Sequence, residues 1–125
     1  KKSPHVVVIA VCTIYRTNGH GRLWAVFQPH LFSRTRQLLD GFARSFADAD
    51  EVLIVDIYAA REQDDGSIHS RDLVAAAQRY HSRVRYGGSL ATAAEILKKE
   101  TAPEDVIVLM GAGDVGEVGE MLGAM

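Results

Sequence analysis

The sequence predicts an α/β fold with three layers (αβα), in which helices cover both faces of a mainly parallel sheet. Three observations support this prediction: apolar runs of strand length, helical patterns between them, and short polar loops at the junctions. From residue 23 onward, strand and helix patterns alternate along the chain. Such alternation predicts parallel strands, because each right-handed crossover places a helix against the sheet.

The expected strands are short apolar runs rich in Val, Ile and Leu. Runs of this kind are typical of parallel strands that are buried on both faces. They cover residues 23–27, 52–58, 84–86 and 106–110. A carboxylate, Asp56, interrupts the second run near its end.

The expected helices carry apolar residues at helical spacing on one face. A serine stands at an N-cap position before each of the first three expected helices. The first helix covers 34–46 after Ser33, the second follows Ser70, and the third runs from Ser89 to Pro103. The inward stripe of the first is Leu38, Leu39, Phe42, Ala43 and Phe46, and that of the second is Leu73, Val74, Ala77 and Tyr80. Gly87-Gly88 is expected to end the short third strand, and a last helix follows Gly116.

Length and composition indicate one globular domain over residues 1–125. The chain is 47% hydrophobic and long enough to bury a core without metals or disulfides. Its formal charge of −2 gives no general attraction for nucleic acid, and no apolar run approaches the roughly 20 residues of a membrane span. We therefore expect neither nucleic acid nor a membrane as a partner. Because Lys1 is not preceded by an initiator Met, we expect the chain to be a piece of a longer protein.

The cysteine and the histidines add no site of their own. Cys12 lies in an apolar run without an internal disulfide partner, which predicts a buried, unreactive thiol in a reducing cytoplasm. The five histidines lack the spacings of common zinc motifs, so no metal site is predicted.

The first candidate functional residues are Gln28, His30 and Arg34. They lie between the end of a buried strand and the start of a helix, where open α/β sheets bind their ligands. His30 suits an acid or base, a ligand-orienting donor or a capping group. Arg34 is placed in a first helical turn, where a cation opposes the helix dipole, and this favours an anionic partner.

Asp56 and Tyr58 end the next strand at the same edge of the sheet. A buried strand rarely carries a carboxylate without a partner. Asp56 is therefore expected to cap, to line a cleft, or to pair with Arg34 or Arg61.

A glycine motif follows the last strand, with Gly111, Gly113 and Gly116 in the spacing of a dinucleotide fingerprint. A true fingerprint has an acidic residue at the end of a following strand, which this sequence lacks. A tight turn between strand and helix is the favoured interpretation, and contact with an anionic group is the alternative.

Three segments, Val26–Arg36, Asp56–Glu62 and Gly111–Gly116, resemble the carboxyl-terminal domain of the Mur ligases in order and spacing. The resemblance runs from about Gly21 to Met125. It implies a Rossmann-like domain of a cytoplasmic, ATP-dependent ligase of peptidoglycan synthesis, and hence of cell-wall biogenesis, cell shape and division. The branch that the motifs resemble most joins L-alanine to UDP-N-acetylmuramate through an acyl phosphate.

The resemblance also implies how the work is divided between domains. ATP and Mg²⁺ would be bound mainly outside this chain, and UDP-N-acetylmuramate, L-alanine and ATP would meet it through the missing domains. The chain alone would be inactive, since no complete catalytic set and no P-loop lies in it. A related ligase that recycles peptides, or a stand-alone nucleotide-binding or regulatory module, are the alternatives.

Carried over position by position, the resemblance places His30 and Arg34 at the substrate cleft. Gln28 and Tyr58 join them as substrate-binding candidates, while Asp56, Gly111 and Gly113 are supporting residues. Leu31 stands where some relatives carry a second Arg, so that contact is not expected here.

Residues 6–14 give two conflicting predictions. Their β-branched cluster favours a strand by propensity. The family pattern favours an alanine-rich helix after a motif of which His5 would be a remnant. We predict the helix, because tertiary context often overrides propensity.

Overall fold

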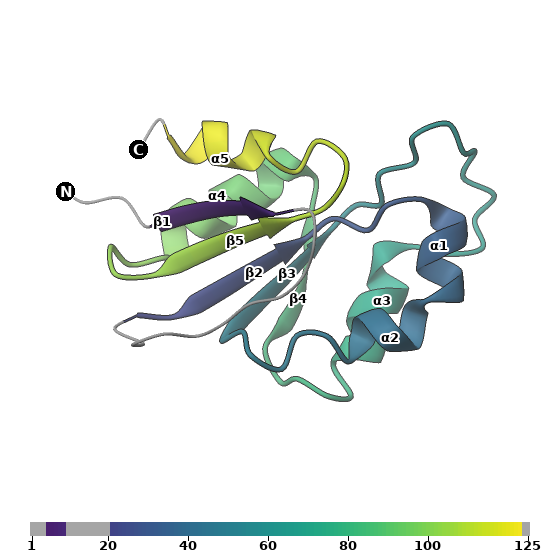
Figure 1. Ribbon diagram of the computed structural model, residues 1–125, viewed down its shortest axis with the longest axis horizontal. Helices are drawn as coiled ribbons and strands as arrows, with labels where there is room; N and C mark the ends of the chain where they lie inside the picture. The colour runs from purple at the N-terminus through teal and green to yellow at the C-terminus, as the bar shows by residue number, and fades with distance from the viewer. Residues whose placement is uncertain (1–4, 10–20, 124–125) are drawn as a thin grey trace.

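Within the residues that the structure describes, the sheet has five strands and is parallel throughout. The computed structural model of the chain describes residues 5–9 and 21–123 (Figure 1). The strands are β1 (His5–Ile9), β2 (Leu23–Phe27), β3 (Glu51–Val55), β4 (Val84–Gly88) and β5 (Val106–Met110). Their order across the sheet is β1-β5-β2-β3-β4, so the predicted parallel arrangement is confirmed.

Helices cover the sheet on two sides, as predicted for a three-layer fold (Figure 1). They are α1 (Phe32–Gln37), α2 (Leu39–Ala43), α3 (Ser70–Ala77), α4 (Leu90–Glu100) and α5 (Glu117–Leu122). One apolar core joins the sheet to α2 and α3, and a second joins it to α4 and α5. None of the helices in the described part of the chain has the length and hydropathy to cross a membrane.

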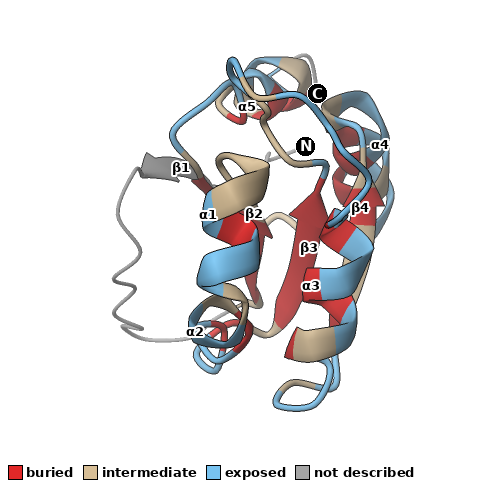
Figure 2. Cartoon of the chain, turned by 90° about the vertical axis from the view of Figure 1, so that its right-hand side faces the viewer, coloured by how far each residue is buried: buried red, intermediate tan, exposed pale blue. Residues whose placement is uncertain are grey.

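The central strands are continuous apolar runs because their successive side chains point alternately into the two apolar cores on either face of the sheet. Along β2, Trp24 and Val26 belong to the core under α4 and α5, while Ala25 belongs to the core under α2 and α3. β3 is buried at every position (Figure 2). These two strands form the rigid centre from which the site loops leave.

The helix predicted over residues 6–14 is wrong over residues 6–9, which belong to the edge strand β1. This strand pairs with β5 in parallel register, with Val6 opposite Ile107 and Val8 opposite Leu109. The β-branched propensity decides here, because β5 offers its backbone groups as hydrogen-bonding partners along that edge. Residues 10–14 of the prediction, and Cys12 with them, lie outside the described residues.

The helix predicted over 34–46 is broken into two short helices. The N-cap of α1 is Leu31 rather than Ser33, and α1 ends at Gln37, because the next residue, Leu38, departs from helical backbone geometry (φ −108°, ψ 19°). Leu38 is 49% exposed instead of facing the core. Beyond the break, Phe42 and Phe46 pack on the ring of Phe27, with centroid distances of 5.1 and 5.7 Å.

Three further boundaries differ from prediction. The second predicted strand leaves the sheet after Val55. Ser70 does not cap α3, because its Oγ donates to the Val55 carbonyl (2.6 Å) and His69 is the N-cap. β4 continues to Gly88, and at Gly87 an added Cβ would lie 3.2 Å from Val55 Cγ1, so the glycine lies closely packed inside the strand.

Other local predictions are confirmed. Ser89 caps α4, accepting a hydrogen bond from the Thr92 amide (3.1 Å). The last turn of α4 also carries Lys98 and Lys99, a placement that the helix dipole favours for cations. In α3, Leu73, Val74 and Ala77 are buried as predicted. The prediction that Tyr80 belongs to the same inward stripe is wrong, because α3 ends at Ala77 and Tyr80 is 45% exposed.

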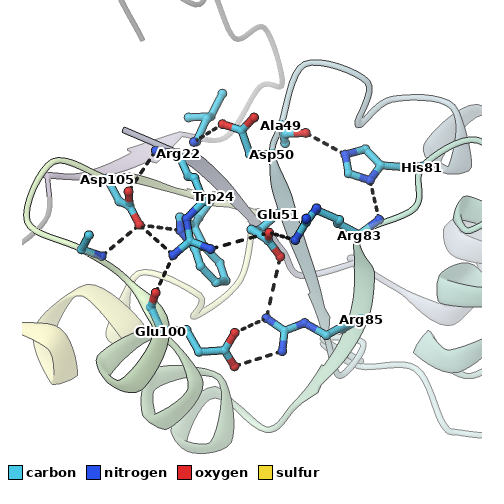
Figure 3. Close-up of polar contacts among 12 residues, drawn as sticks. Arg22, Trp24, Ala49, Asp50, Glu51, His81, Arg83, Arg85, Glu100 and Asp105 are labelled. Atoms are coloured by element: carbon cyan, nitrogen blue, oxygen red, sulfur yellow. Dashed lines mark hydrogen bonds and ion pairs between the residues drawn. The ribbon is translucent and has the colours of Figure 1, made fainter. Parts of the chain in front are cut away.

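At the amino ends of the strands, two buried carboxylates lie among arginines (Figure 3). Asp105 accepts hydrogen bonds from the Arg22 and Ala102 amides (both 2.9 Å) and from Trp24 Nε1 (3.0 Å). Glu51 pairs with Arg83 at 2.9 Å. Glu100 binds both guanidinium nitrogens of Arg85 (3.0 and 2.9 Å). This network lies opposite the loops that follow the strands, so we interpret it as structural.

Acid is expected to destabilise the protein through this network. The hydrogen bond from Arg85 lowers the pKa of Glu100. Burial alone would raise the pKa of Asp105, but the amide hydrogen bonds outweigh it and the pKa is lowered. Both carboxyls therefore bind protons more weakly in the folded state, so their contribution is full above the ordinary values near pH 4 and is lost as pH falls through the lowered ones.

Denaturant titrations between about pH 6 and about pH 2 would measure this loss as a falling free energy of unfolding. Asp105→Asn, which cannot titrate at this position, should show a shallower fall. An equal slope in both proteins would assign the acid sensitivity to other groups.

Candidate functional site

The candidate site lies where the chain leaves the carboxyl ends of β2, β3 and β5. His30 and Tyr58 form an isolated parallel bridge between the first two exits. The Leu31 amide donates to the Tyr58 carbonyl (2.9 Å), and the Tyr58 amide donates to the Pro29 carbonyl (2.8 Å). The rings of His30 and Tyr58 are stacked, with centroids 5.7 Å apart and an interplanar angle of 14°. The structure thus brings two predicted site residues together.

The backbone on both sides of this bridge is strained. Leu31 has φ 70° and Ala60 has φ 53°, and they are the only non-glycine residues with positive φ among residues 5–9 and 21–123. The left-handed conformation costs about 1–2 kcal/mol for such residues. Strain of this kind persists where the surrounding contacts determine the backbone, and it concentrates at functional sites.

Gln28 fastens the end of β2 to the turn after β5. Its amide donates to the Met110 carbonyl (2.9 Å), and its side-chain Nε2 donates to Asp114 Oδ1 (2.6 Å). The side chain is buried, and its Oε1 has no hydrogen-bond partner in the described part of the chain. Sequence analysis did not single out Asp114, although its place inside the glycine motif was a usable signal.

The turn over residues 111–116 is packed against the protein itself. A Cβ on Gly113 would lie 2.5 Å from Tyr58 Cγ and 2.8 Å from Gln28 Oε1. A Cβ on Gly111 would lie 3.1 Å from the Gln28 carbonyl oxygen. The favoured interpretation, a tight turn, agrees with these contacts, because the Tyr58 ring occupies the space that a phosphate would need beside Gly113.

The described residues do not fit ATP and Mg²⁺ at this turn. Besides the filled space at Gly113, no cluster of three His, Cys, Asp or Glu side chains within residues 5–9 and 21–123 could hold a metal ion. A complex of ATP and Mg²⁺ needs backbone space for phosphates and oxygen ligands for the metal. The contacts at Gly113 therefore do not favour this turn as the place where the phosphates of a nucleotide bind.

Arg34 is exposed on α1 and makes no ion pair with any described residue. Because α1 has only six residues, Arg34 lies also in its last turn, so the predicted unfavourable placement against the helix dipole does not apply. The anionic group at the start of this helix is Glu62. Its carboxylate accepts hydrogen bonds from the Ser33 amide (3.1 Å) and from the Ser33 hydroxyl, and the hydroxyl bond is the main reason that the pKa of Glu62 is lowered. Leu31 has no side-chain oxygen that could accept a hydrogen bond from the first amides of α1, so the Glu62 carboxylate caps the helix instead.

Of the three roles considered for Asp56, pairing with Arg34 or Arg61 is not observed in the described residues. Asp56 is exposed beyond the end of β3, and its carboxylate accepts a hydrogen bond from the hydroxyl of Tyr86 on β4. This hydrogen bond, together with burial, raises the pKa of Tyr86. Arg71 lies over the Tyr86 ring at 4.7 Å. Asp56 thus links the ends of two neighbouring strands.

The sequence belongs with a known family of ligases. The family model described as "Mur ligase, glutamate ligase domain" matches residues 3–113, which is most of the chain. The chain belongs to the Mur ligase family. The predicted resemblance is therefore confirmed, and the parallel α/β fold is the Rossmann-like domain that the resemblance implied.

Curated relatives narrow the similarity to one kind of Mur ligase. Proteins named UDP-N-acetylmuramate–L-alanine ligase are 47% identical over 106 residues in Acetivibrio thermocellus, 44% over 110 in Mycolicibacterium paratuberculosis and 38% over 97 in Trichodesmium erythraeum. These matches cover 85%, 88% and 78% of this chain, but only 23%, 22% and 18% of the relatives. The chain thus spans about a fifth of the length of such a ligase.

Proposed function

We propose that residues 1–125 form one domain, the carboxyl-terminal domain of a cytoplasmic ligase that joins L-alanine to UDP-N-acetylmuramate in peptidoglycan synthesis. The main support is the 47% identity to the Acetivibrio thermocellus ligase over 85% of this chain. The strained, stacked corner around His30 and Tyr58 lies inside the matched region. Cell-wall growth, cell shape and cell division would depend on this reaction.

In this proposal the corner receives the incoming amino acid. Arg34 is exposed and unpaired within the described residues, so its guanidinium is available to bind the L-alanine carboxylate in a bidentate pair. His30 and Tyr58 form the adjoining surface of the site. Gln28, Gly111 and Gly113 lie in the segments that pack against this surface. Asp56 would contribute through its hydrogen bond with Tyr86 on the neighbouring strand.

The remaining chemistry is proposed to take place on other domains. The muramate carboxylate would receive the γ-phosphoryl group of ATP, and the alanine amine would then attack the acyl carbon and release phosphate. ATP and Mg²⁺ would be bound mainly outside this chain, in keeping with the filled turn at Gly113. The domain therefore acts as one wall of a larger active site.

A domain exchange tests this proposal. In the chimera, this chain replaces the corresponding segment of the Acetivibrio thermocellus ligase, and phosphate release is followed with UDP-N-acetylmuramate, L-alanine and ATP. We expect turnover by the chimera, and none by the 125-residue chain or by the relative without its last domain. Turnover by the chain alone, or an inactive but folded chimera, would contradict the proposal.

The same proteins test the alternatives. If the chimera uses a tripeptide acceptor in preference to L-alanine, the chain comes from a peptide-recycling ligase. Equilibrium dialysis of the 125-residue chain with ATP and NAD tests the stand-alone nucleotide-binding module. Binding of either nucleotide at micromolar concentration would favour that module over the ligase domain.

A further inference from the structure

The Tyr58 ring rests directly on the backbone of Gly113. The atoms nearest to an added Cβ at this glycine are Tyr58 Cγ (2.5 Å) and Cδ1 (2.7 Å). Cγ is the first atom of the ring, so a rotation of the ring about its own axis would not move it away. Relief would require a different direction of the whole Tyr58 side chain.

The backbone of Tyr58 has little room to give way. Its amide and carbonyl are both bonded to the segment that carries His30, at 2.8 and 2.9 Å. The turn that carries Gly113 is held in turn by the hydrogen bond from Gln28 to Asp114. Two fixed segments therefore meet at the contact between ring and glycine.

Space, and not backbone conformation, makes glycine necessary at this position. The described glycines with positive φ are Gly66 and Gly88, so Gly113 has a backbone that other residues can adopt. Gly41 in α2 is the opposite case, because an added Cβ there would meet nothing within 4 Å. Gly41 therefore serves as the control for Gly113, because an added Cβ has free space at Gly41 and meets close contacts at Gly113.

We infer that Gly113 is a positioning residue that holds the Tyr58 ring in its stack on His30. The glycine motif thus serves the corner on the neighbouring strands instead of a phosphate. The ring contact links the exits of all three central strands, β5 through Gly113, β3 through Tyr58 and β2 through His30. The positioning of the Tyr58 ring is inferred from these contacts alone, and only the expected effect of Gly113 on ligation rests on the proposed function.

The geometric part is tested on the 125-residue chain by NMR. The His30 ring protons lie in the ring-current field of Tyr58, so their chemical shifts report the stack. We expect Gly113→Ala to move these resonances, while Gly41→Ala leaves them at wild-type positions. Unchanged His30 resonances in folded Gly113→Ala would overturn the inference.

A double-mutant cycle keeps the test valid if Gly113→Ala folds poorly. In a Tyr58→Ala background the ring is absent, and of the three closest contacts of the new methyl group only the one with Gln28 Oε1 (2.8 Å), at the end of a longer side chain, remains. Gly113→Ala should then be much less destabilising than in the wild-type background, which denaturant titration measures. Equal destabilisation in both backgrounds would show that the ring contact is not the reason for the glycine.

The functional part is tested in the chimera. Misplacing a substrate-contacting group by about 1 Å costs on the order of 100-fold in rate, so Gly113→Ala is expected to lower kcat/KM for L-alanine by about that factor. Gly41→Ala should match the wild type. Shifted His30 resonances with unchanged kinetics would support the positioning role and contradict the proposed use of the corner in ligation.

Discussion

Arg34→Ala in the chimera is expected to lower kcat/KM for L-alanine by about 100-fold. Removing one partner of a charged pair at a binding site costs about 2–5 kcal/mol, and each 1.4 kcal/mol is tenfold. The effect should appear mainly as a higher KM for L-alanine, since the proposed contact is to its carboxylate. The fold should stay intact, because Arg34 is exposed and contributes no hydrogen bond from its side chain to any described residue.

Two variants make this experiment decisive. Arg36→Ala, two residues further along α1, removes an exposed arginine whose guanidinium reaches Ser67 (2.8 Å), and it should leave ligation near normal. Arg34→Lys keeps the charge but loses the planar fork, so we expect an intermediate KM. Wild-type kinetics for Arg34→Ala would remove Arg34 from the proposed alanine site.

Asp105→Ala is expected to lower the free energy of unfolding by about 3 kcal/mol. The substitution removes the acceptor for the Trp24 indole N–H and for the Arg22 and Ala102 amides, at a position that is only 2% exposed. Buried donors without an acceptor cost far more than the net value of the bonds themselves. Equilibrium denaturation of the 125-residue chain by guanidinium measures the loss.

Asp48→Ala is the matched control, because Asp48 is an exposed carboxylate in the turns after α2. Surface substitutions of this kind change stability by about 0.5 kcal/mol or less. If Asp105→Ala were equally mild, the network in Figure 3 would be a surface feature with little part in stability.

The central strands could be predicted because their signal is local. β2 and β5 match the predicted ranges, since burial on both faces leaves an uninterrupted apolar run that single residues do not obscure. For β1 the family pattern predicts a helix, whereas the β-branched propensity favours the strand that is observed. The break at Leu38 was missed because the group that caps α1, Glu62, lies on another loop, and no local pattern records such a contact.

For the candidate site, too, local sequence signals could be predicted and contacts between distant segments could not. Gln28, His30 and Tyr58 could be placed at one edge, because carboxyl ends of parallel strands meet there. Which of them touch depends on strand order and register, as the stack of His30 on Tyr58 shows. Likewise, Asp56 meets Tyr86 because β3 and β4 are neighbours, which one-dimensional spacing could not establish.

The position of β5 bears on how the polypeptide folds as it is synthesised. Among the described strands β5 comes last in sequence, yet it lies between β1 and β2. While a ribosome still holds residues 106–110, β2, β3 and β4 can already pair, but β1 lacks the described strand with which it pairs. β1 must therefore wait for β5, although it is synthesised before the other described strands.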